Sequence, residues 1–106
     1  MSRHSLRRLP RWAATALLVS TLPAVAQDAL LARNLAATCA NCHGTNGVSV
    51  GEVASLAGRP KDDLVRRMQD YKKGTVPGTI MPQLAKGYTD EQIDVVAGWF
   101  AAQKAK

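Results

Sequence analysis

The sequence predicts an all-α fold for the part of the chain that follows its first 26 residues. Apolar residues recur there at helical spacing in three separate segments, and most glycines and prolines lie between these segments. Residues 27–106 contain no alternating apolar and polar run of the kind that marks a β-strand, and no internal repeat. We therefore expect one small domain of helices and loops.

The first 26 residues have the pattern of a secretory signal peptide. Four arginines precede an apolar stretch from Trp12 to Leu22, and the small residues Ala24-Val25-Ala26 follow Pro23. The alternative is a retained membrane anchor, but a spanning helix needs about 20 apolar residues and this stretch is shorter. We expect cleavage near Ala26, a periplasmic location, and a domain of residues 27–106 that does not span a membrane.

The signal peptide also accounts for most of the positive charge. The whole chain has 14 Lys and Arg against 8 Asp and Glu, a net charge of +6. Without the four arginines of the signal peptide, 10 basic residues face 8 acidic ones and the net charge is +2. The charge therefore gives no support to nucleic-acid binding.

The first helix is expected from Asp28 to Cys39. Asp28 can cap it, and Leu31 and Leu35 recur at helical spacing. The run Gly44-Thr45-Asn46-Gly47 then breaks regular structure. In residues 48–58 the apolar residues recur with neither helical nor strand spacing. This stretch is predicted to be a loop.

Two further helices are expected. Pro60 suits the first turn of the second helix and Gly74 can close it, with acidic residues at its start and lysines at its end. Residues 74–87 contain too many glycines and prolines for a long helix. Thr89 and Gln92 fit a capping box that opens the last helix, which continues through Phe100.

The chemistry is concentrated in Cys39-Ala40-Asn41-Cys42-His43, which matches the C-x-x-C-H attachment sequence for c-type haem. Thiols three residues apart project from one side of a helical turn, so Cys39 and Cys42 can both add to the vinyl groups of one haem. The imidazole of His43 then faces the iron. Export and this motif support each other, and they predict one covalent haem c.

Three other roles for Cys39, Cys42 and His43 account for the sequence less well than haem attachment. A simple disulfide is possible in an oxidising compartment, but it leaves His43 without a role. A thioredoxin-type redox pair normally follows a strand, and no such pattern is present. A structural zinc ion needs four ligands, whereas residues 27–106 contain two cysteines and one histidine.

The second axial ligand is expected to be Met81. A thioether opposite imidazole stabilises reduced iron, and residues 27–106 contain only Met68 and Met81. Met68 shares a helical face with Leu64 and Tyr71, so we expect it to fill the core, whereas Met81 lies in the irregular segment before Pro82. The main alternative is an open sixth position, as in a haem sensor or peroxidase.

His43 needs its second ring nitrogen held, and a carbonyl between Val48 and Gly58 is the expected acceptor. The remaining basic residues are expected to form a solvated face; they include Arg66, Arg67, Lys72, Lys73 and Lys86. Some of them can also steer a redox protein partner during encounter.

With these residues in place, residues 27–106 resemble the class I c-type cytochromes, a helical fold around one haem. Within that class the runs 42–47 and 56–58 resemble the small bacterial group of cytochromes c4 and c553. The segment 79–88 is similar to the methionine loop of the cytochrome subunit of flavocytochrome c sulfide dehydrogenase. One difference is Ala54, where the c4 and c553 group usually has the proline whose carbonyl binds the histidine ring.

The resemblance implies a haem subunit that docks on an FAD-containing subunit, which oxidises sulfide and passes electrons singly to the haem. The chain itself would then be an electron carrier and not an enzyme. A free periplasmic carrier of the c553 or c4 type is the alternative, and a sensor or peroxidase with an open iron site is a further one. By the same resemblance, Ala54 is the candidate acceptor for the ring of His43.

Overall fold

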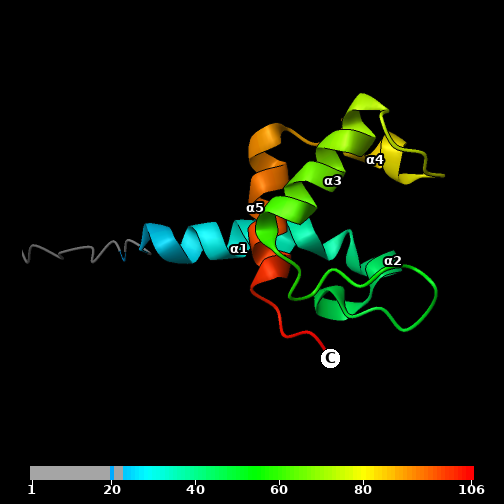
Figure 1. Ribbon diagram of the computed structural model, residues 1–106. Helices are drawn as coiled ribbons and strands as arrows, with labels where there is room; N and C mark the ends of the chain where they lie inside the picture. Colours follow the sequence, from blue (N-terminus) through cyan, green and yellow to red (C-terminus); the bar gives the residue numbers. More distant parts are fainter. Residues whose placement is uncertain (1–19, 21–22) are drawn as a thin grey trace, which may run out of the picture.

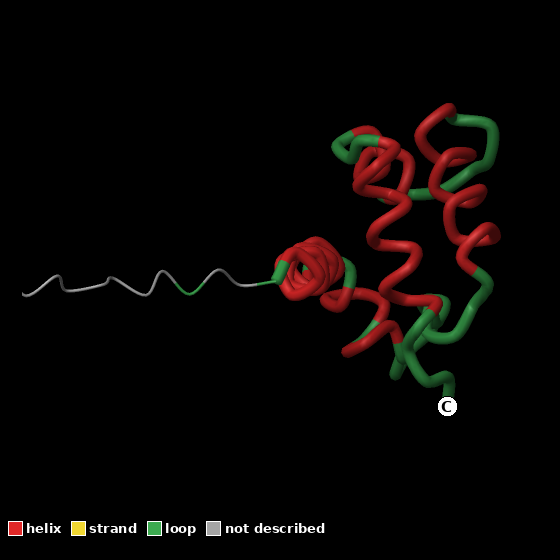
Figure 2. The backbone as a smooth tube through the Cα atoms, turned by 90° about the vertical axis from the view of Figure 1, so that its left-hand side faces the viewer, coloured by secondary structure: helices red, strands yellow, loops and turns green. Residues whose placement is uncertain are grey.

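The computed structural model describes Ser20 and residues 23–106, so the predicted signal peptide, residues 1–26, lies mostly outside the described residues. The elements in chain order are α1 (Ala24–Ala37), α2 (Ala40–His43), the 3₁₀ turn η1 (Thr45–Gly47), α3 (Lys61–Lys73), α4 (Met81–Lys86) and α5 (Asp90–Ala101) (Figure 1). This described part contains helices and loops and no strand, which confirms the predicted all-α class (Figure 2). None of its helices is long and apolar enough to cross a membrane.

The helices pack around α5. This helix contacts α1 and α3, and α4 packs against α3 at the far end of the molecule from the C-terminus (Figure 1). A small apolar cluster fills the space where α1, α3 and α5 meet: Ala36, Leu64, Val96, Ala97 and Phe100. A domain of this size buries only about 60% of the surface of its unfolded chain, so this cluster provides a limited core.

The ends of α3 and α5 follow the sequence signals. Gly74 has a φ of 76° and closes α3 in the left-handed conformation, donating its N–H to the carbonyls of Asp70 and Tyr71. At the start of α5, the Gln92 N–H donates to Thr89 Oγ1 at 3.1 Å, and the Thr89 N–H donates to Gln92 Oε1 at 3.0 Å. The predicted capping box is therefore confirmed.

Two boundaries differ from the prediction. α1 begins at Ala24 with Pro23 in the cap position, so Asp28 lies inside the helix and does not cap it. Within the segment expected to be irregular, Met81 begins the six-residue helix α4. Pro82 is compatible with this helix because the N–H groups of a first turn have no intrahelical partner to lose.

The loop between α2 and α3 is fastened to the core at Gly47. The Gly47 carbonyl accepts hydrogen bonds from the N–H groups of Leu56 at 2.8 Å and Ala57 at 3.1 Å. Gly47 has a φ of 76°, and a Cβ there would lie 2.6 Å from the ring of Phe100. The Gly58 N–H also donates to the Phe100 carbonyl at 2.9 Å. These contacts hold residues 56–58, the last part of the loop, beside η1 and α5.

Candidate haem site

The cysteine motif forms a compact turn at the end of α1. The Cys39 N–H donates to the Ala36 carbonyl at 3.0 Å, and the His43 N–H donates to the Cys39 carbonyl at 2.9 Å. Both thiols are free in the structure, and Cys39 is partly buried while Cys42 is exposed. Burial raises the pKa of the Cys39 thiol, and a hydrogen bond with Thr38 opposes this effect.

The imidazole of His43 is held from the loop that follows. Its Nδ1 lies 2.6 Å from the carbonyl oxygen of Ala54. A carbonyl can only accept a hydrogen bond, so Nδ1 carries the proton and donates it. The Nε2 of a neutral imidazole is then unprotonated and can bind a metal. The structure thus joins His43 to Ala54, the residue expected from the resemblance.

A glycine makes the turn after His43 possible. Gly44 has a φ of 84°, which L-residues with a side chain rarely adopt. A Cβ at this position would also overlap the carbonyl of Val48. The chain can therefore reverse directly after His43 and return Ala54 to the imidazole ring.

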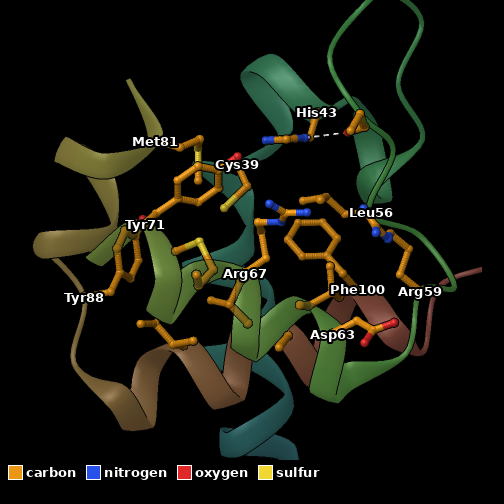
Figure 3. Close-up of a pocket in the computed structure, with 16 residues that line it drawn as sticks. Cys39, His43, Leu56, Arg59, Asp63, Arg67, Tyr71, Met81, Tyr88 and Phe100 are labelled. Carbon is orange, nitrogen blue, oxygen red and sulfur yellow. Dashed lines mark hydrogen bonds between the residues drawn. The ribbon is translucent and has the colours of Figure 1, made fainter. Parts of the chain in front are cut away.

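The turn faces a cavity of about 310 Å³, which lies in the range of ligand and cofactor pockets (Figure 3). Its walls come from the cysteine turn, the following loop and helices α3, α4 and α5. The lining residues are Cys39, His43, Ala54, Leu56, Arg59, Asp63, Leu64, Arg67, Met68, Tyr71, Met81, Tyr88, Ile93, Val96, Ala97 and Phe100. Cys39, His43 and Met81 are thus brought together, whereas Cys42 does not line the cavity.

Both methionines of the described residues line this cavity. Met81 reaches it from the start of α4, while His43 reaches it from α2 (Figure 3). Met68 lies on α3 between Leu64 and Tyr71, which also line the cavity. Met68 is therefore a wall residue of the site, beyond the core-filling role expected for it.

Three charged residues of the site were not expected. Arg59, Asp63 and Arg67 line the cavity, and the side chain of Arg67 extends toward Cys39 and His43 (Figure 3). The prediction that Arg67 belongs to a solvated face is therefore incomplete. Its position three residues after Leu64 and four before Tyr71 was the available signal, because these spacings share one helical face.

The residues of this cavity fit a covalently attached haem by their chemistry. The site offers one imidazole with a free Nε2, a thioether, and a thiol at its edge, within walls that are mainly apolar. Imidazole and thioether are the axial donors of low-spin electron carriers. The thiol of Cys42 is exposed and free, so it is accessible to an attachment reaction.

Comparison with known proteins finds similarity to bacterial cytochromes. The cytochrome subunit of sulfide dehydrogenase from Chlorobaculum tepidum is 38% identical over 66 residues, which cover 62% of this chain and 60% of the relative. Cytochrome c4 from Azotobacter vinelandii is 31% identical over 96 residues, covering 81% of this chain and 46% of the relative. This chain is related to the class I c-type cytochromes. No family model matches it.

These cytochrome relatives differ in length. The chain spans only about half the length of the first two, 60% and 46% respectively. Cytochrome c-554(548) from Halomonas halodenitrificans is different, because the match at 29% identity over 83 residues covers 100% of that protein and 74% of this chain. A cytochrome of this kind can therefore consist of one unit of this size.

Proposed function

We propose that residues 27–106 carry one covalent haem c and transfer single electrons. Cys39 and Cys42 would attach the haem, and His43 and Met81 would bind its iron from opposite sides. The observation that carries this proposal is the shared cavity of Cys39, His43 and Met81, in which His43 is held by Ala54 so that its Nε2 is left for a metal. The motif and the cytochrome relatives support the same assignment.

A haem with two protein ligands supplies a one-electron couple and leaves no position for a substrate. The residues of the chain would set the properties of that couple. The hydrogen bond from His43 to Ala54 fixes the ring orientation and makes the imidazole a better donor. The thioether of Met81 and the apolar walls formed by Leu64, Ile93 and Phe100 favour the reduced, less charged state.

Expression in a bacterium that exports the chain and attaches haem tests the cofactor and the ligand. Intact mass should show one porphyrin added to the chain, and a product without that mass would overturn the proposal. The pair Met81→Ala and Met68→Ala separates the two methionines. Only the first variant should open the reduced iron to rapid carbon monoxide binding. Rapid binding in the unaltered protein would favour a sensor or peroxidase.

We further propose that the chain serves as the cytochrome subunit of a sulfide-oxidising flavocytochrome c, in the periplasm after cleavage near Ala26. The relative from Chlorobaculum tepidum supports this role, as does the segment 79–88, which contains Met81. The partner would be an FAD-containing subunit that oxidises sulfide, and the haem subunit would receive its electrons singly.

A free electron carrier is the second candidate, and the full-length match to the Halomonas cytochrome favours it. Affinity purification of the tagged chain from its native periplasm distinguishes the two roles. A co-eluting protein with a flavin spectrum would support the subunit role. Elution of the haem protein alone, with electron transfer to other periplasmic redox proteins, would support the free carrier.

A further inference from the structure

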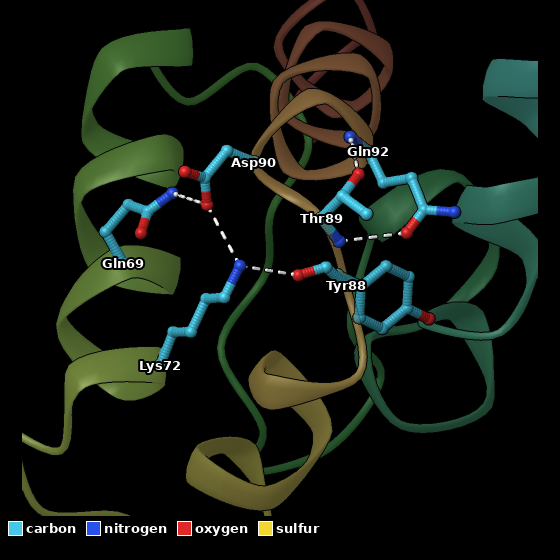
Figure 4. A network of polar contacts seen from close by, with 6 residues as sticks. All are labelled: Gln69, Lys72, Tyr88, Thr89, Asp90 and Gln92. Carbon is cyan, nitrogen blue, oxygen red and sulfur yellow. Dashed lines mark hydrogen bonds and ion pairs between the residues drawn. The ribbon is translucent and has the colours of Figure 1, made fainter.

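The chain directly after α4 is held at Tyr88 by two hydrogen bonds from different helices. The carbonyl of Tyr88 accepts a hydrogen bond from Lys72 Nζ of α3 at 2.7 Å (Figure 4). The hydroxyl of Tyr88 lies 2.8 Å from Thr38 Oγ1, at the end of α1. Tyr88 is therefore fixed through both its backbone and its side chain.

The direction of the bond between Tyr88 and Thr38 follows from the neighbouring contact. Besides the tyrosine, Thr38 Oγ1 has one proton and two acceptors within reach, the Leu35 carbonyl at 3.0 Å and Cys39 Sγ at 4.0 Å, and the proton goes to the carbonyl, which is the nearer and stronger acceptor. The tyrosine hydroxyl must then donate to Thr38, which accepts through a lone pair. The result is a chain of two hydrogen bonds from Tyr88 through Thr38 into the backbone of α1.

Lys72, which donates to the Tyr88 carbonyl, is positioned by an ion pair of its own. Lys72 Nζ forms an ion pair with Asp90 Oδ1 at 2.9 Å, and Gln69 Nε2 donates to the same oxygen at 2.9 Å (Figure 4). Asp90 is the first residue of α5. The position of Tyr88 is thus defined by α1, α3 and α5 together.

Tyr88 lies seven residues after Met81, and the six-residue helix α4 forms most of the connection. Ala85 is buried in this helix, and the Tyr88 N–H donates to its carbonyl at 3.3 Å, so the tyrosine is joined directly to α4. Both side chains, Met81 and Tyr88, line the same cavity (Figure 3). A shift of Tyr88 would therefore be transmitted along α4 to the methionine.

We propose that Tyr88 is a positioning residue for Met81. Its hydroxyl bond to Thr38 ties the methionine segment to the cysteine turn, because Thr38 immediately precedes Cys39. The bond spans 50 residues of sequence and connects the two sides of the haem site. This inference rests on the proposed function, in which Met81 binds the haem iron.

The test measures how readily Met81 leaves the iron. Imidazole added to the oxidised haem protein competes with the methionine, so its apparent affinity reports the strength of methionine binding. Tyr88→Phe and Thr38→Val each remove one side of the bond and keep the shape of the residue. Tyr88→Phe should raise the imidazole affinity about fivefold, the effect of one lost hydrogen bond. Thr38→Val also loses the bond to Leu35, so it should raise the affinity at least as much. The double variant should give no more than Thr38→Val alone.

The controls separate positioning from general loss of stability. Thr45→Val removes an exposed threonine hydroxyl for which the described residues show no hydrogen bond, and it should leave the affinity unchanged. Lys61→Met breaks the ion pair with Asp94 at 2.8 Å. It should lower the urea midpoint of unfolding and leave the imidazole affinity unchanged. Unchanged imidazole affinity in Tyr88→Phe and Thr38→Val, or fully additive effects in the double variant, would overturn the inference.

Met81→Ala distinguishes this inference from the proposed function. If that variant raises the imidazole affinity and the Tyr88 and Thr38 variants do not, methionine ligation stands and the positioning role fails. If Met81→Ala leaves the affinity unchanged, Met81 is not a ligand and both proposals fail.

Discussion

The Nδ1 atom of His43 donates to the carbonyl oxygen of Ala54 at a distance of 2.6 Å. Eleven residues separate the two, and Gly44 provides the reversal that brings them together. The bond fixes which ring nitrogen is free, so it determines how His43 can bind a metal. Since the acceptor is a backbone atom, another side chain at position 54 can keep the bond while changing how rigidly the carbonyl is held.

Ala54→Pro should therefore keep the bond and stabilise the protein. The Ala54 N–H donates no hydrogen bond to the backbone of the described residues, so a proline loses none there. A compatible proline stabilises a fold by about 0.4–1 kcal/mol because it restricts the unfolded chain. Urea unfolding of the haem protein checks this. A lower midpoint, or a changed haem spectrum, would show that the loop cannot accept the proline.

Gly44→Ala should prevent the His43 loop from forming. With φ 84° and ψ 160°, Gly44 lies in a backbone region that essentially only glycine adopts, which costs another residue on the order of 1–3 kcal/mol, and the added Cβ would also overlap the Val48 carbonyl. We expect a loss above about 2 kcal/mol and a low yield of haem protein. Gly51→Ala is the matched control, because a Cβ there meets nothing within 4 Å. Equal yields of the two variants would contradict the role given to Gly44.

The sequence predicted the features whose signals are local. Gly74 and the capping box of Thr89 and Gln92 mark helix ends through contacts within a few residues. The cysteine motif likewise lies within one turn. The bond between Thr38 and Tyr88 could not be predicted, because it joins residues 50 positions apart and depends on how α1 packs near α5.

Charged residues were the least predictable part of the site. From the sequence, Lys72 and Arg67 are expected on a solvated face, because charged side chains usually remain exposed. In the structure Lys72 reaches the Tyr88 carbonyl and Asp90, and Arg67 lines the cavity. A long aliphatic stem allows such a residue to cross apolar surface, so its spacing alone does not tell where its charge lies.

Asp90→Asn should reduce stability near neutral pH and have less effect in acid. The hydrogen bond from Gln69 and the charge of Lys72 hold the pKa of the Asp90 carboxyl below its usual range. A carboxylate with a lowered pKa in the folded state stabilises the fold above its unfolded pKa. That contribution is lost as the pH falls through the folded pKa. Melting temperatures of both proteins from neutral to acid pH should therefore converge.

Glu52, in the loop before α3, provides the control for this comparison. Its carboxylate is exposed, and within the described part of the chain its side chain forms no hydrogen bond. Glu52→Gln should follow the parent protein over the whole pH range. A constant difference between Asp90→Asn and the parent, down to the most acid point, would show that Asp90 acts through something other than its charge.

Loss of the haem should unfold most of the chain. The cavity is lined by Leu64, Val96, Ala97 and Phe100, four of the five residues of the buried cluster, so without haem this cluster borders empty or wet space. Buried apolar surface contributes about 25 cal/mol per Å², and a domain of this size has little other core to replace it. Circular dichroism of Cys39→Ala/Cys42→Ala, which cannot attach haem, should show a large loss of helix relative to the haem protein. Because this variant has no thiols, a disulfide cannot restore structure, and equal helicity in the two proteins would mean that the helices form a stable core without the cofactor.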